Sequence, residues 1–210
     1  MEGRPFFVST ATIAAALGRV RSIASDLSVA AINAKVIAFR AGSQAAGFRP
    51  ITQFIDQTAR AAATLGYEIE LCTQSAARAA VSERRVAETV RRLRRAKVCA
   101  RSGDAASLDA VIERCETARI THSESVSRSI RTIEVLLDEI DARIRSISVI
   151  AVQSRVEAQQ AGTFSVNLEV VAASMSGSAE QIKAIVRQSR RELGNALAAR
   201  VKPTADLVAL

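Results

Sequence analysis

Apolar residues recur at alternating steps of four and three along most of this chain. The longest such run is Val126, Ile130, Ile133, Leu137, Ile140, Ile144, Ile147, Ala151, Ser154, Ala158 and Ala161. A period of 3.5 residues sustained over this many heptads is typical of coiled-coil helices. The pattern therefore predicts long helices, each with one continuous apolar seam.

Turn-like sequences divide this pattern into four segments. They occur at 42–47 (GSQAAG), 102–104 (SGD) and 162–165 (GTFS), and Pro50 suits the first turn of a helix. The predicted helices span residues 9–42, 48–101, 105–161 and 166–201. In the second and fourth helices the expected seam includes Thr58, Leu65, Cys72, Val171, Ser178 and Ile185.

These helix lengths predict one elongated all-α domain over residues 1–210. Short connections make successive helices antiparallel, which gives an up-down-up-down four-helix coiled-coil bundle. Hairpin 1 covers about 9–101 with its tip at 43–47, and hairpin 2 covers about 105–201 with its tip at 163–167. The connecting turn is expected at 102–104. Because the outer helices are shorter, residues 81–125 should protrude as a two-helix arm.

Composition agrees with this fold and bears on the compartment. The chain is 49% apolar, 24% charged and only 3% aromatic, which argues against both β-sandwiches and disorder. Residues 6–17 (FFVSTATIAAAL) could pass for a signal peptide, but Glu2 and Pro5 disrupt the basic region that should precede it. The sequence contains no unbroken run of 18 apolar residues, so we expect no membrane-spanning segment.

The cysteines also favour a reduced, cytoplasmic protein. Cys72, Cys99 and Cys115 are odd in number and form no CxxC pair. All three can be placed on apolar helix faces, where a free thiol behaves as a small hydrophobe.

Two segments match without a gap at an offset of 120 residues. Residues 28–42 read SVAAINAKVIAFRAG and residues 148–162 read SVIAVQSRVEAQQAG, with seven of fifteen positions identical. Both copies end at a glycine turn, and both turns fall at the same end of the predicted bundle. An internal repeat is the simplest explanation.

The first copy, NAKVIAFRAG at 33–42 followed by Gly47 and Phe48, resembles the hairpin tip of methyl-accepting chemotaxis proteins. The second copy, QSRVEAQQAG at 153–162, is a more divergent version of the same tip. In that family two chains each contribute one hairpin to a four-helix dimer. The resemblance implies that this chain carries both hairpins, as a single-chain pseudo-twofold mimic of a receptor tip.

The resemblance also implies a binding surface, because the family tip contacts a histidine kinase and its coupling protein. Carried over by position, the apolar contacts are Val29, Ile32, Val149 and Val152, and the polar ones are Asn33, Gln153, Arg40 and Glu157. Each copy keeps only part of the family's Glu and Arg pair, since Ile37 replaces the Glu and Gln160 the Arg. The expected partners are a chemotaxis-type kinase, its coupling protein or chemoreceptors.

A run of basic residues marks the end of the second helix: Arg84, Arg85, Arg91, Arg92, Arg94, Arg95, Lys97 and Arg101. Residues 81–101 carry eight basic and two acidic residues, while residues 104–124 carry five acidic and two basic ones. Antiparallel pairing would bring these opposite charges together within the arm. The alternative function is a basic scaffold for nucleic acid or anionic membrane, although no aromatic residues accompany the run for base stacking. The arm's apolar seam would need a partner or self-association to cover it.

No pattern of catalytic or cofactor-binding residues accompanies these features. His122 is the only histidine, and the chain has no phosphate-binding glycine loop and no clustered metal ligands. We therefore expect a non-enzymatic, cytoplasmic signalling or adaptor protein without cofactor or metal.

Overall fold

The fold is all-helical, as the apolar period predicts. A computed structural model describes residues 6–99 and 102–201, which form four α-helices, two short 3-10 helices and no strand. The α-helices are α1 (Phe6–Arg40), α2 (Phe48–Cys99), α3 (Ser102–Gln159) and α4 (Ser165–Val201). The 3-10 helices η1 (Gly42–Ala45) and η2 (Gly162–Phe164) form the two hairpin tips.

The connections differ from the predicted turns in two places. Residues 102–104 belong to α3 rather than to a connecting turn, and the residues between α2 and α3 lie outside the described part of the chain. Residues 165–167, predicted as part of the second tip, already belong to α4. Ser and Asp favour the first turn of a helix as much as they favour a turn, so the sequence pattern alone does not separate the two.

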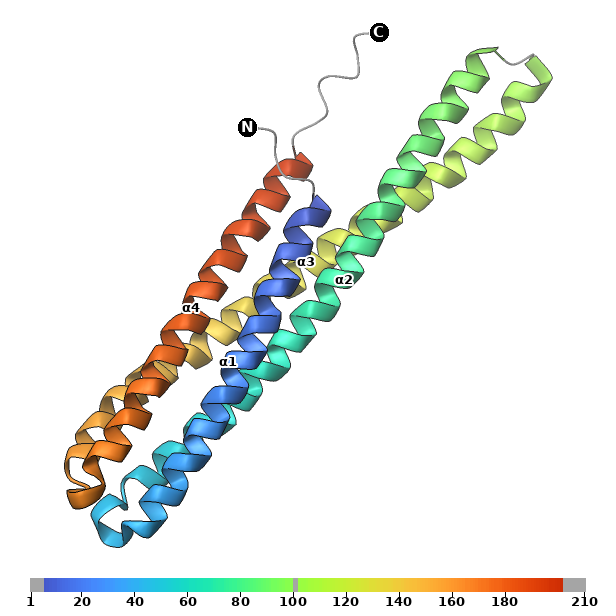
Figure 1. The fold of residues 1–210 in the computed structure, drawn as a ribbon. Coiled ribbons are helices and arrows are strands. Elements are labelled where there is room, and N and C mark those ends of the chain that lie inside the picture. Colours follow the sequence, from blue (N-terminus) through green and yellow to red (C-terminus); the bar gives the residue numbers. More distant parts are fainter. Residues whose placement is uncertain (1–5, 100–101, 202–210) are drawn as a thin grey trace.

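The four helices lie side by side, with both hairpin tips at one end (Figure 1). Helix α1 packs against α2 and α4, and α3 packs against α2 and α4. The helices therefore follow one another around the bundle in chain order. As a result, the side shared by α1 and α2 lies opposite the side shared by α3 and α4.

Helices α2 and α3 continue as a pair beyond the ends of α1 and α4 (Figure 1). Arg200 near the end of α4 marks this step, because its Nη2 lies 2.9 Å from Glu83 Oε2 and 3.2 Å from Ser123 Oγ. The guanidinium of Arg200 also lies 5.3 Å from the ring centroid of Phe6, at the start of α1. We call the part of α2 and α3 beyond this step the arm.

A single core runs along the bundle and contains most of the predicted seam residues. The largest fully buried side chains include Leu17, Leu27, Ile55, Phe48 and Leu168, together with Ile133, Leu137, Ile140, Ile144 and Ile147 of α3. Such side chains supply the main stabilisation, at about 1.5–3 kcal/mol for each one fully buried.

The seams of α2 and α4 are broader than predicted. Thr52, Ala59, Thr73 and Ala172 are buried one residue after expected seam positions, whereas Cys72 and Val171 are only half-buried. Ile51 is buried beside Thr52, and Thr58 beside Ala59, so more than two positions in a heptad of α2 face the core. A strict seven-residue pattern does not reveal this third buried position.

Helix α1 is the one described helix that is long and apolar enough to cross a membrane. This property holds for Val8–Arg40 by length and composition only, and 28% of its most apolar window is buried in the bundle. The expectation based on an unbroken apolar run missed this segment, since Ser, Thr and Gly interrupt it. Its seam residues Ile13, Leu17 and Val20 are fully buried, so part of this apolar character builds the core.

Candidate protein-binding surface at the bundle tips

An exposed row of large apolar side chains follows the outer face of α1 toward its tip. Val29 is 54% exposed, Ile32 44%, Val36 46% and Phe39 74%. Their spacing of three, four and three places them on one face of the helix, next to the buried seam. We call Val29, Ile32, Val36 and Phe39 the first apolar stripe.

An equivalent row lies on α3, displaced by 120 residues. Val149 is 70% exposed, Val152 62% and Val156 51%. We call these three residues the second apolar stripe. On α4, Val166 and Val170 are 68% and 65% exposed near the same tip. The four apolar contact positions predicted from the sequence, two in each copy, are therefore all accessible.

The two copies of the repeat are also buried in the same way. Every residue from 22 to 40 is buried, half-buried or exposed like the residue 120 positions later. Sequence identity covers only part of this segment, so the shared burial pattern is an independent sign that the hairpins are equivalent. It supports the internal repeat inferred from the sequence.

Polar contacts between helices show which way the stripes face. In heptads abcdefg with the buried seam of α1 at a and d, Arg21 and Ser28 occupy e positions, and both contact α2: Ser28 donates to Asp56, and Arg21 Nη1 lies 3.3 Å from Glu70 Oε2. The stripe residues occupy b and f, beside e, so the first stripe lies on the side shared by α1 and α2. Arg155 donates to Ser176 at 3.3 Å in the same register, which places the second stripe on the opposite side of the bundle.

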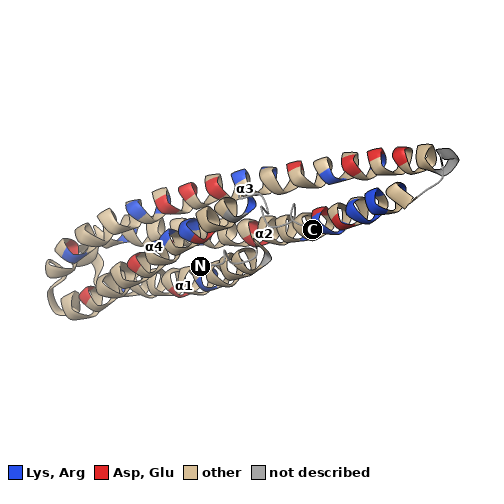
Figure 2. Ribbon diagram, turned by 90° about the horizontal axis from the view of Figure 1, so that it is seen from above, with Lys and Arg blue, Asp and Glu red and all other residues tan. Residues whose placement is uncertain are grey.

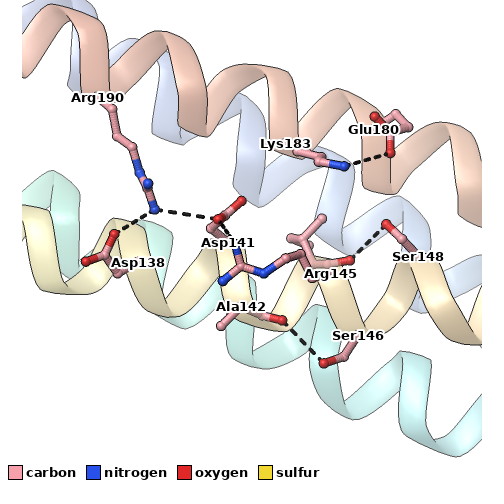
Figure 3. A network of polar contacts seen from close by, with 10 residues as sticks. Asp138, Asp141, Ala142, Arg145, Ser146, Ser148, Glu180, Lys183 and Arg190 are labelled. Atoms are coloured by element: carbon pink, nitrogen blue, oxygen red, sulfur yellow. Dashed lines mark hydrogen bonds and ion pairs between the residues drawn. The ribbon is translucent and has the colours of Figure 1, made fainter.

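A polar network joins α3 to α4, formed on α3 by residues that precede the second stripe in the chain (Figure 3). Arg190 Nη2 lies 2.6 Å from Asp138 Oδ1 and 3.7 Å from Asp141 Oδ2, and Arg145 also pairs with Asp141. These groups are partly exposed, so each pair contributes about 0–1 kcal/mol. Their main effect is to hold the helices in register beside the apolar side chains.

In the first hairpin, Asp56 of α2 joins the two helices by accepting a hydrogen bond from Ser28 of α1. Partial burial raises its pKa, but hydrogen bonds from Ser28 and Arg60 and the positive charges of Arg60 and Lys35 outweigh this effect and lower the pKa below its ordinary value. The Arg60 Nε lies 3.0 Å from Asp56 Oδ1. The ionised carboxylate therefore favours the folded pairing of α1 with α2.

The two tips contact each other reciprocally. The carboxylate of Glu157 occupies the space that a Cβ of Gly47 would fill, and a Cβ on Gly162 would lie 2.8 Å from Gln44 Oε1. Gly42 and Gly162 have φ values of 63° and 56°, the left-handed conformation that favours glycine after a helix. The absence of side chains at Gly47 and Gly162 lets the two hairpin tips approach closely.

The polar residues predicted for the binding surface divide into two groups. Asn33, Arg40 and Gln153 are exposed beside the stripes, as a contact surface requires. Glu157 is half-buried and faces the other tip, so its main contact lies within the chain. Because Gly47 has no side chain, the Glu157 carboxylate packs directly against it. The sequence pattern did not reveal this contact between the two tips.

Sequence reasoning missed several apolar residues of this surface: Val36, Phe39, Val156, Val166 and Val170. The available signal was their position outside the seam, since a large apolar residue at b or f has no core neighbour. The Arg49 guanidinium lies 5.3 Å from the Phe39 ring centroid, which keeps this aromatic group beside the tip.

The basic run lies on the part of α2 that belongs to the arm (Figure 2). Arg94 pairs with Glu116 at 3.0 Å and Lys97 pairs with Asp109 at 2.5 Å, so part of the run joins the two helices as predicted. Arg92 pairs within α2 with Glu88. Arg84, Arg85, Arg91 and Arg95 are exposed and form no ion pair within the described residues, whereas Arg101 lies outside that part.

The three thiols and His122 differ in their exposure. Cys72 and Cys115 are half-buried, but Cys99 is exposed, contrary to its predicted place on an apolar face. Burial and the charge of Glu68 raise the pKa of the Cys72 thiol. His122 is half-buried on α3. Among the described residues, no group of three or more His, Cys, Asp and Glu side chains could hold a metal ion.

Comparisons with protein-family models, with curated proteins and with solved structures found no match to this chain. The resemblance to chemoreceptor tips therefore rests on the residues around the two turns.

Proposed function

We propose that this chain is a non-enzymatic cytoplasmic signalling adaptor that acts through protein–protein contacts at its bundle tips. Its partner would be a chemotaxis-type histidine kinase, the kinase's coupling protein or a chemoreceptor array. The proposal combines the resemblance of residues 33–48 and 153–162 to receptor tips with the surface that those segments carry.

The observation that carries this proposal is the pair of exposed apolar stripes at equivalent positions. Val29 and Val149 are 54% and 70% exposed, and Ile32 and Val152 are 44% and 62% exposed. A row of apolar side chains at three- and four-residue spacing fits an amphipathic helix or the edge of an apolar groove. Exposed apolar patches of this kind mark interaction sites.

We further propose that the four helices form an antiparallel coiled coil with pseudo-twofold symmetry. The continuous seams of α1 and α3, the neighbours of each helix and the shared burial pattern of residues 22–40 and 142–160 support this arrangement. In such a bundle, equivalent stripes on opposite sides would let one chain engage two partners.

A binding measurement with the kinase and the coupling protein tests the proposal. Each purified partner is titrated against the full chain and against the double variant Val29→Glu, Val149→Glu. A charge within each stripe, at the end farther from the tip, should weaken binding at least about tenfold, since a buried unpaired carboxylate opposes complex formation.

Val135→Glu is the matched control. Val135 is 65% exposed on α3 and lies at the same heptad position as Val149, but two heptads farther from the tip. This variant should bind like the original chain. Absence of binding by the unaltered chain, or an equal loss in the control variant, contradicts the proposal.

A further inference from the structure

A groove opens beside the step where the bundle gives way to the arm. It has a volume of about 580 Å³, and its surface is mostly apolar. Residues of α1, α2, α3 and α4 contribute to it: Phe6, Ala80, Val81, Glu83, Arg84, Arg85, Ala87, Glu88, Arg119 and Arg200. Most of these belong to α2, so the groove follows that helix away from the start of α1.

The groove continues the line of α1 along α2. Within the bundle, Glu70 of α2 contacts α1 through its pair with Arg21. Arg84 and Arg91 follow Glu70 by two and three heptads, and the start of α1 at Phe6 lines the same groove as Arg84. Among the described residues, no further part of α1 covers this side of α2 in the arm.

The floor of this open side is apolar and its rim is basic. Ala80 and Ala87 are half-buried and line the groove, and Val81 beside Ala80 is 42% exposed. Arg84 and Arg85 border the groove, and Arg91 and Arg95 continue the row along α2. From Arg84 to Arg95 the row covers about three turns of helix. All four guanidinium groups are exposed and form no ion pair within the described residues.

The acidic groups nearby do not neutralise this row. Glu83 binds Arg200, Glu88 binds Arg92, and Glu116 binds both Arg94 and Arg119. Arg84, Arg85, Arg91 and Arg95 of α2 are exposed, while α3 carries most of the acidic residues of the arm (Figure 2).

We propose that this groove binds one amphipathic helix of a partner protein, with small apolar side chains toward α2 and acidic side chains toward the arginine row. The helix would take the place that α1 would occupy if it continued. This surface is separate from the apolar stripes, which lie near the opposite end of the bundle. Phosphate groups of a nucleic acid or of lipids would pair with the arginines but would leave the apolar floor unused.

Peptide binding to the full chain tests this proposal. The probe is a fluorescent peptide of about 20 residues with Ala and Leu at a and d and Glu at b and e, a length of about 30 Å as a helix. Fluorescence anisotropy should show saturable binding. The variant Arg84→Glu, Arg91→Glu, Arg95→Glu should bind at least about tenfold more weakly.

The charge control is the variant Arg128→Glu, Arg131→Glu, Arg187→Glu. It changes the net charge of the chain equally, and its three exposed side chains lie on α3 and α4 away from the groove. It should bind the peptide like the original chain. An equal loss in both variants would mean that only the overall charge attracts the peptide, and the proposal would be wrong.

A second variant separates the floor from the rim. Val81→Asn with Ala87→Gln removes apolar surface without changing charge, and it should weaken peptide binding severalfold. Duplex DNA of about 20 base pairs and vesicles containing phosphatidylserine are titrated in parallel. Failure of the peptide to bind, tighter binding of DNA or vesicles through the same arginines, or self-association lost with those arginines would each overturn the proposal.

Discussion

Gly42 and Gly162 end the helices at the two tips through their left-handed backbone conformation, with φ values of 63° and 56°. A side chain at either position strains the backbone by about 1–2 kcal/mol. The surroundings of the two glycines differ, however. A Cβ at Gly42 would meet nothing within 4 Å, whereas a Cβ at Gly162 would lie 2.8 Å from Gln44 Oε1.

This difference predicts unequal effects of Gly42→Ala and Gly162→Ala in urea unfolding. The first should lower the free energy of unfolding by about 1 kcal/mol, and the second should lower it further because Gln44 must move. Gly177→Ala, within α4 and with open space around it, should raise that free energy by about 0.5–1 kcal/mol. Equal losses in all three variants would contradict this account of the tips.

Asp56 predicts a dependence of stability on pH. Because its pKa is lowered in the folded chain, its contribution is complete above the unfolded value of about 4 and is lost as the pH falls through the folded value. Asp56→Asn should therefore destabilise the chain by about 1 kcal/mol at pH 7 and less at pH 3, as measured by thermal unfolding. Asp138→Asn, whose pair with Arg190 is exposed, should show a smaller difference between these pH values.

At the scale of one helix, α3 presents two apolar rows with different roles. Ile144, Ile147 and Ala151 are buried in the bundle, while Val149, Val152 and Val156 are exposed. Both rows consist of aliphatic residues, so hydrophobic character alone does not separate them. What separates them is the angular position around the helix relative to α2 and α4.

Ile147→Ala and Val149→Ala should therefore change the free energy of unfolding by very different amounts. The first removes fully buried methyl groups and should lower the free energy of unfolding by about 2–5 kcal/mol. The second changes a residue that is 70% exposed and should alter stability by less than about 0.5 kcal/mol. Denaturant unfolding of the two variants checks this directly, and a large loss with Val149→Ala would show that the second stripe is covered within the chain.

The whole molecule is an elongated bundle that continues into a narrower arm (Figure 1). Helix α3 has 58 residues, which corresponds to a length of about 87 Å. This shape places the apolar stripes near the hairpin tips and the arginine-lined groove at the step between the bundle and the arm. The two proposed binding surfaces are therefore separated along the length of the molecule.

Small-angle X-ray scattering of the chain should report this shape. A rod with one helix pair at one end gives a maximum dimension of about 90 Å, far above that of a compact protein of this size. Arg200→Ala should leave that dimension unchanged, since it removes contacts only at the step between bundle and arm. A maximum dimension near 50 Å would exclude an extended arm.

The helices follow from local sequence, because a 3.5-residue apolar period and a few glycine turns act locally. Most of the α3 seam and the glycine turns at 42 and 162 come from that local information, whereas Val29 and Val149 were predicted from the resemblance to receptor tips. The third buried position of α2, the contact of Glu157 with the other tip and the groove beside Phe6 do not follow from local sequence. These features depend on which helix lies next to which and on where each one stops, and only the tertiary structure decides that, since residues distant in the chain create them.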